Sequence, residues 1–219
     1  MTDAFFEAIR KGDTATVGEM LSQDPGLANA RTPEGIHAAV LALYHGEAAV
    51  ADAILARKPT LDLPAAAAVG DLARVRELVE KDPAAVHSYS VDGFPPLGLA
   101  AYLGHRDLVE YLLSKSADAD QTGKNRSKFT ALTGAVASGR REVVRILLEA
   151  GADPNYRYAG GFTPVLEAAA RGDIPLLELL TAHGRDGTVE TEQGRTAVAL
   201  ALENGHVDAA EWLRRREAK

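Results

Sequence analysis

The sequence predicts an all-α solenoid of about seven stacked helix–turn–helix units. The first observation is a row of glycines, at Gly12, Gly46, Gly70, Gly104, Gly139, Gly172 and Gly205, with intervals of 34, 24, 34, 35, 33 and 33 residues. The second is that apolar residues stand five and eight positions after each glycine, on one face of a helix. The third is an alanine-rich helical stretch before these glycines, such as residues 165–170. A period near 33 residues is typical of solenoids.

The two apolar columns identify the second helix of each unit. The column five residues after the glycine reads Val17, Ala51, Val75, Val109, Val144, Leu177 and Ala210. The column eight residues after it reads Met20, Ile54, Leu78, Leu112, Leu147, Leu180 and Leu213. We expect both columns to face the interior of the stack.

The units are predicted to span residues 1–30, 31–61, 62–89, 90–122, 123–157, 158–190 and 191–219. Each unit of a solenoid buries its apolar face only against its neighbours, so the first and last units should act as caps. In the first unit we expect Phe5 and Phe6 to pack inward, while Glu7, Arg10 and Lys11 face water.

The ends of the second helices carry two kinds of signal. Asp24 and Asp82 each precede a proline, which disfavours helical backbone at the aspartate and so ends the helix. In the fourth and fifth units Ser116 and Gly151 occupy the end position, where glycine suits a left-handed cap.

The sequence also indicates where the first helices begin. Thr163 offers a capping hydroxyl, and Pro164 then takes the first helical position, where a missing N–H costs nothing. Thr130 and Thr196 keep the cap without the proline, whereas Pro95 replaces the capping residue altogether.

Two irregularities interrupt the period. The interval from Gly46 to Gly70 is about nine residues short, and the missing part is the connection between units, because residues 58–62 lead straight into a helix. Conversely, residues 121–128 lengthen the connection before the fifth unit by two residues relative to the 33-residue period. Long connections in repeat proteins tend to lie on the binding face.

Three segments carry a family resemblance. Residues 92–120 read DGFPPLGLAAYLGHRDLVEYLLSKSADAD, residues 161–172 read GFTPVLEAAARG, and residues 147–155 read LLEAGADPN. These segments resemble the ankyrin repeat, whose pattern runs D-G-x-T-P-L-H-x-A-A-x-x-G-H, then an apolar helix and G-A-D-V-N. The histidine of the pattern is absent, and Gly98, Thr133, Leu166 and Ala199 fill its place. The resemblance implies an ankyrin solenoid with short β-hairpin fingers between units.

The resemblance also implies which residues meet a partner, because ankyrin repeats bind through finger tips and the last turn of the first helix. The finger column reads Ile36, Phe94, Phe129, Phe162 and Arg195, and Tyr44 and Tyr102 stand two residues before their glycines. Aromatic side chains often dominate binding energy, so these phenylalanines and tyrosines are predicted to line a concave strip. The alternative is that each phenylalanine packs its finger onto its own helix pair.

The finger after the fifth unit carries Tyr156 and Tyr158, which we also predict to contact a partner because a finger offers little core to bury them. Gly160 and Gly161 follow, and we interpret them as a hairpin turn rather than an anion site, since no phosphate-loop pattern surrounds them.

A group of cations has two interpretations, a binding site for an acidic peptide or a solvated face. Lys124 and Arg126 are the predicted contact residues, with Lys128, Arg140 and Arg141 nearby in sequence.

Composition narrows the partner classes. Residues 1–110 hold 9 Lys and Arg against 16 Asp and Glu, a balance of −7, while residues 111–219 hold 15 of each. This is not the basic footprint of a nucleic-acid binder. There is no cysteine, no N-terminal signal pattern and no run of 18 apolar residues. We expect a soluble, cytoplasmic monomer that binds neither nucleic acid nor membrane.

Catalytic and metal-binding motifs are not evident. The six histidines do not form the close pairs typical of zinc sites, and no G-x-S-x-G, phosphate-loop or H-E-x-x-H pattern occurs. We therefore predict no cofactor, no metal and no enzyme activity. The predicted function is protein–protein recognition, as an adaptor or stoichiometric regulator. The alternatives are an inhibitor or immunity-type protein that blocks one enzyme, an unrecognised enzyme, and a self-assembling structural protein.

Overall fold

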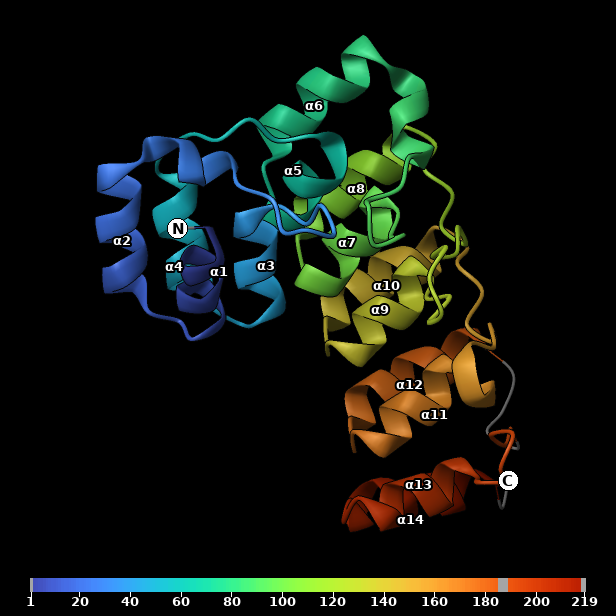
Figure 1. The fold of residues 1–219 in the computed structure, drawn as a ribbon. Coiled ribbons are helices and arrows are strands. Elements are labelled where there is room, and N and C mark those ends of the chain that lie inside the picture. Colours follow the sequence, from blue (N-terminus) through green and yellow to red (C-terminus); the bar gives the residue numbers. More distant parts are fainter. Residues whose placement is uncertain (1, 185–188, 218–219) are drawn as a thin grey trace.

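The computed structural model describes residues 2–184 and 189–217, and these residues form an all-α solenoid (Figure 1). Within these two ranges there are 14 α-helices and three short 3-10 helices, and the only strand-like pairings are isolated bridges, Arg31 with His37 and Glu190 with Thr196. The predicted fold class is confirmed. The fingers are therefore turns closed by single bridges or side-chain bonds rather than extended ribbons.

The helices alternate between a first and a second helix of each pair. The first helices are α1 (Thr2–Arg10), α3 (Ala38–Tyr44), α5 (Leu63–Val69), α7 (Pro96–Leu103), α9 (Ala131–Ala137), α11 (Pro164–Ala170) and α13 (Ala197–Glu203). The second helices are α2 (Thr14–Gln23), α4 (Ala48–Leu55), α6 (Leu72–Lys81), α8 (Arg106–Ser114), α10 (Arg141–Glu149), α12 (Ile174–His183) and α14 (Val207–Glu217). The 3-10 helices are η1 (Pro25–Asn29), η2 (Pro83–His87) and η3 (Ala159–Gly161).

The second helices bury the predicted apolar columns, with one correction. Every residue of the first column is buried, as are five residues of the second. Met20 and Leu78 are only half-buried, however, and the next residues, Leu21 and Val79, take the interior positions. Positions three and four after a buried residue lie on the same helical face, so either can point inward. Both exceptions fall in the helices that end at Asp-Pro and continue into a 3-10 helix.

The predicted helix caps are present. Thr163 Oγ1 accepts the backbone N–H of Leu166 at 3.4 Å, and Thr130 forms a reciprocal capping box with Thr133. Pro95 precedes α7 without a side-chain cap. Phe5 and Phe6 are buried, as expected for the N-terminal cap of the stack.

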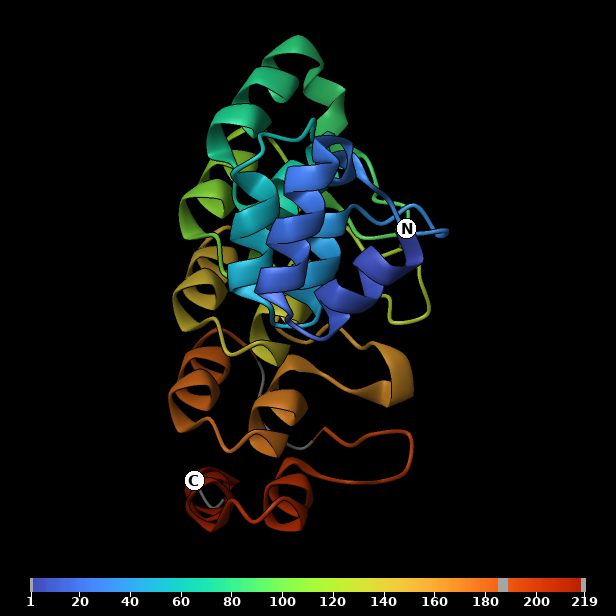
Figure 2. The same ribbon diagram turned by 60° about the vertical axis from the view of Figure 1, so that its left-hand side comes forward.

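The stack is interrupted where the sequence lacks a finger. Elsewhere a side chain of the next unit lies over the turn glycine, as Glu47 does at Gly12 and His105 at Gly70. Nothing lies within 4 Å of the Cβ position of Gly46. The buried side chains accordingly divide into two clusters, a smaller one in α1–α4 and a larger one from Val40 to Leu213. Figure 1 shows α1–α4 to one side of the column that α7–α14 form, and Figure 2 shows the same ribbon turned by 60°.

The lengthened finger of residues 121–128 packs onto the finger before it. The backbone N–H of Lys124 donates to the carbonyl of Gly93 at 2.8 Å, and the side chain of Asn125 donates to the carbonyl of Asp92 at 3.0 Å. Beyond it, Gly160 and Gly161 have φ of +76° and +74°, and Gly161 N–H donates to Tyr158 O at 2.9 Å, which confirms the predicted turn.

Candidate protein-binding groove

A groove with aromatic walls lies across α3, α7 and α9 and the fingers that precede α7 and α9. It encloses about 250 Å³. Its lining residues are Tyr44, Phe94, Gly98, Leu99, Tyr102, Phe129, Thr130 and Gly134. Four of the nine predicted contact residues thus meet in one groove, which is called the aromatic groove below.

Small residues between the aromatic walls leave room in the aromatic groove. Gly98 and Gly134 line the groove without a side chain of their own, and a Cβ on Gly134 would lie 3.6 Å from Tyr102 Cβ. Gly98 also fills the position of the family histidine, so the departure from the ankyrin pattern opens this part of the surface. The groove is therefore a product of large residues on the rim and minimal residues between them.

Tyr44 is a fixed wall of the groove. Its hydroxyl donates to Asp92 Oδ2 at 2.8 Å, a bond that joins the end of α3 to the finger before α7. Burial of the phenol, followed by the nearby carboxylate of Asp92, raises the pKa of Tyr44 well above its ordinary value of 10.0. The ring therefore stays neutral and held in place at physiological pH.

Tyr102 is the most accessible of the four aromatic residues, with 43% of its surface exposed. Its backbone carbonyl accepts a bond from Arg140 Nε at 3.3 Å, which ties this last turn of α7 to the next unit. Phe94 and Phe129 are half-buried, so each packs on the fold and also presents part of its ring to the groove. The packing alternative for the phenylalanine column is thus met in part, and contact with a partner stays a prediction.

The other predicted aromatic residues form a second row beside the groove. The rings of Phe129 and Tyr158 meet edge to face at 5.0 Å, and Tyr158 and Phe162 lie 6.1 Å apart. The Tyr158 hydroxyl donates to Glu167 Oε2 at 3.0 Å, and burial together with that carboxylate raises the pKa of Tyr158. Tyr156 donates its hydroxyl to the carbonyl of Lys128 at 3.0 Å. Both finger tyrosines are half-buried, contrary to our expectation that a finger offers them little cover.

The five cations do not form one cluster. Lys124, Arg126 and Lys128 belong to the long finger before α9, whereas Arg140 and Arg141 follow the far end of that helix. A seven-residue helix is roughly 10 Å long, so the two groups are separate. Arg141 pairs with Asp173 at 3.0 Å, and Lys124 Nζ lies 3.9 Å from the ring centre of Tyr89.

A second cavity, of about 320 Å³, lies between the finger of residues 31–37 and the finger of residues 88–94. It occupies the place where the third unit lacks a finger, and we call it the junction cavity. It shares Tyr44 and Leu99 with the aromatic groove. The short Gly46–Gly70 interval marks this place in the sequence, but the interval predicts only a missing finger and not a cavity.

Within residues 2–184 and 189–217 no group of three His, Cys, Asp or Glu side chains is placed to hold a metal ion. Across the same ranges no helix has both the length and the apolar character that crossing a bilayer requires.

Paired helices, turn glycines and projecting fingers define a helical repeat protein, with a groove across its first helices. The family model "Ankyrin repeats (3 copies)" matches residues 63–158. The chain is thus similar to ankyrin repeat proteins, and the same helix pair recurs on both sides of the matched segment. Ankyrin repeats generally mediate protein–protein interactions and are typically non-catalytic.

Three curated proteins are similar to this chain over about half of its length. The chain is 38% identical over 109 residues to a putative ankyrin repeat-containing protein of Treponema pallidum, which is 50% of this chain and 36% of that protein. It is 36% identical over 102 residues to human BCL-6 corepressor-like protein 1, covering 47% of this chain and 6% of the relative. It is 38% identical over 107 residues to mouse ankyrin repeat and SAM domain-containing protein 6, covering 49% of this chain and 12% of the relative. The matches thus span only a minor part of each relative.

Proposed function

We propose that this chain is a non-catalytic protein-recognition module that holds a segment of a protein partner in the aromatic groove. The observation that carries the proposal is the convergence of Tyr44, Phe94, Tyr102 and Phe129 on one cavity of about 250 Å³. Aromatic residues in well-packed pockets are where protein interfaces concentrate their binding energy. The adaptor or regulator role, the cytoplasmic location and the monomeric state remain predictions.

Rigid walls favour binding in this groove. Tyr44 is held by Asp92, and α7 and α9 fix the backbone of Tyr102, Gly98 and Gly134. A preformed surface loses little conformational entropy when a partner docks, so more of the contact energy appears as affinity. An apolar side chain of the partner would enter between the rims, with its backbone along the first helices.

The long finger supplies a polar edge. Lys124 and Arg126 are exposed beside the groove, and Tyr156, Tyr158 and Phe162 continue the aromatic surface toward α11. Rim charges mainly set association rate and salt dependence, whereas buried aromatic contacts set the lifetime of a complex. We therefore expect Tyr102 and Phe129 to control affinity, and Lys124 and Arg126 to control its response to salt.

The test is selection of a displayed random-peptide library on the immobilised protein, followed by calorimetric titration of the enriched peptides. The expected result is that Tyr102→Ala weakens their binding by at least about tenfold, the order of one interface hot spot. Leu202→Ala is the matched control, because Leu202 is similarly exposed (41%) but lies on α13. Far-UV circular dichroism confirms that both variants are folded.

Peptides that bind wild type and Tyr102→Ala equally would place recognition elsewhere. A library without enrichment would contradict the groove as a peptide-binding site. Capture from a native lysate then separates the two binding roles, because a blocking protein should retain one tight partner and an adaptor several.

A further inference from the structure

The junction cavity lies between two fingers that approach each other at the place where the third unit has none. Val91 Cγ1 lies 3.2 Å from the position that a Cβ on Gly35 would occupy, so the two fingers meet near their tips. Tyr44 and Leu99 form the wall shared with the aromatic groove. A volume of about 320 Å³ is at the lower end of the range for small-molecule pockets, about 300–1,000 Å³, and is suited to one side chain.

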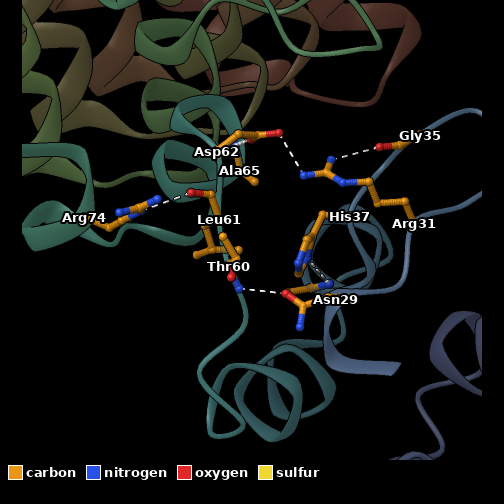
Figure 3. Close-up of polar contacts among 10 residues, drawn as sticks. Asn29, Arg31, Gly35, His37, Thr60, Leu61, Asp62, Ala65 and Arg74 are labelled. Carbon is orange, nitrogen blue, oxygen red and sulfur yellow. Dashed lines mark hydrogen bonds and ion pairs between the residues drawn. The ribbon is translucent and has the colours of Figure 1, made fainter. Parts of the chain in front are cut away.

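The walls near α5 are fixed by bonds across the interruption (Figure 3). Arg31 donates to Asp62 Oδ2 at 2.8 Å and to the carbonyl of Gly35 at 3.1 Å. The backbone N–H of Thr60 donates to Asn29 Oδ1 at 2.7 Å. These contacts join the smaller core to the larger one and hold the cavity open without a finger from the third unit.

One of the two carboxylates in the cavity lining is paired with a cation, and the other is not. Arg31 and Asp62 neutralise each other, and Asp62 also accepts the backbone N–H of Ala65 at 2.9 Å. Asp92, half-buried in the lining, accepts the hydroxyl of Tyr44, and among the residues that the structure describes it has no ion-pair partner. Its carboxylate therefore keeps acceptor capacity for a cation.

Aromatic and hydroxyl groups accompany this carboxylate. The ring of Tyr89, in the same lining, already has an ammonium against it, since Lys124 Nζ lies 3.9 Å from the ring centre. Ser88 Oγ is buried and has no hydrogen-bond partner among the described residues. A carboxylate, an aromatic face and a free hydroxyl together suit a basic side chain better than an acidic one.

We propose that the junction cavity receives one lysine or arginine side chain of the protein partner, with Asp92 as its acceptor. This inference rests on the proposed function, because the same partner segment would lie in the aromatic groove. Tyr44 separates the two sites, so an apolar residue in the groove and a basic residue beyond Tyr44 define the motif. The balance of −7 over residues 1–110 favours the approach of such a segment.

The experiment titrates the isotope-labelled protein with N-acetyl-arginine methylamide, N-acetyl-lysine methylamide and, as controls, the norleucine and glutamate analogues. Backbone amide shifts report occupancy. The expected result is saturable shifts confined to residues 31–37 and 88–94 with the basic probes only. Asp92→Asn should weaken this binding by about tenfold, because it removes the charge while its Oδ1 still accepts the Tyr44 hydroxyl.

Asp52→Asn is the matched control, since Asp52 is exposed on α4 in the same acidic half and is outside the cavity lining. Absence of saturable shifts, equal response to norleucine, preference for glutamate, or unchanged binding by Asp92→Asn would each overturn the proposal. Tyr89→Leu gives a second readout that leaves the Tyr44–Asp92 bond in place.

The selected peptides distinguish this failure from failure of the proposed function. Peptides that depend on Tyr102 but carry no recurrent lysine or arginine, and that ignore Asp92→Asn, would leave the aromatic groove standing and reject the cavity site. Peptides that depend on both Tyr102 and Asp92, with a recurrent basic residue, would support the two sites together.

Discussion

Leu112→Ala tests whether the helices are phased as described. Leu112 lies on α8, is fully buried and belongs to the larger of the two buried clusters. Truncation to alanine removes three carbon atoms, worth roughly 2.4 kcal/mol at about 0.8 kcal/mol for each buried methylene. The cavity left behind adds to this loss, so we expect the free energy of unfolding to fall by about 2–5 kcal/mol.

Urea denaturation followed by far-UV circular dichroism measures this loss, with Leu202→Ala as an exposed control. Hydrogen exchange adds a second readout, because α1–α4 form a separate buried cluster. Protection should fall in α5–α14 and change little in α1–α4. A loss below about 0.5 kcal/mol, the usual effect of a surface substitution, would show that α8 is mis-phased. Equal loss of protection in α1–α4 would show that the two clusters unfold as one.

Three further perturbations address the junction, a cap and the turn glycines. Burial lowers the pKa of His37 from 6.5 to about 4, so between these values the unfolded chain binds a proton that the folded chain does not. Stability should therefore decline as pH falls from about 6.5 to 4, and urea midpoints should decline less for His37→Asn, whose side chain can still cap α3. Thr130→Ala should cost about 1 kcal/mol in the same denaturation assay, through loss of the capping box. Gly46→Ala and Gly70→Ala share a positive φ, +80° and +77°, and both should cost about 1–2 kcal/mol for that reason. Only a Cβ on Gly70 would collide with the His105 ring, so similar midpoints for the two alanine variants would contradict the interrupted stack.

The sequence could predict the features that depend on local patterns. Helix ends at Asp24 and Gly151, the cap at Thr163 and the buried column through Leu112 all follow from residue types at fixed spacing. The positions of Met20 and Leu78 could not be assigned this way, because two adjacent residues on one helical face compete for the interior. Both residues lie on helices that end at Asp-Pro and continue into a 3-10 helix, unlike the other second helices that the structure describes.

The candidate site also contains residues that the sequence could place and residues whose burial it could not predict. Tyr44, Phe94, Tyr102 and Phe129 could be placed on one face because they share positions in a repeat, and the structure brings all four to one groove. The half-burial of Tyr156 and Tyr158 depends on contacts of their finger with Lys128 in the preceding finger and with Glu167 on α11. Such contacts depend on how neighbouring fingers lean, which spacing within one repeat does not encode.

The missing finger is the common cause of three observations. Where it is missing, no side chain of the third unit lies over Gly46, and the buried side chains divide into two clusters. The neighbouring fingers then approach each other at Gly35 and Val91 and enclose a recess in place of a wall. Where the connection is about nine residues short, the stacking contact at Gly46 is therefore absent, and the junction cavity lies beside the aromatic groove. If the two cavities serve one partner, substitutions that restore stacking at Gly46 should stabilise the chain and weaken capture of basic peptides together, because both effects depend on the same displacement of α3 from α5.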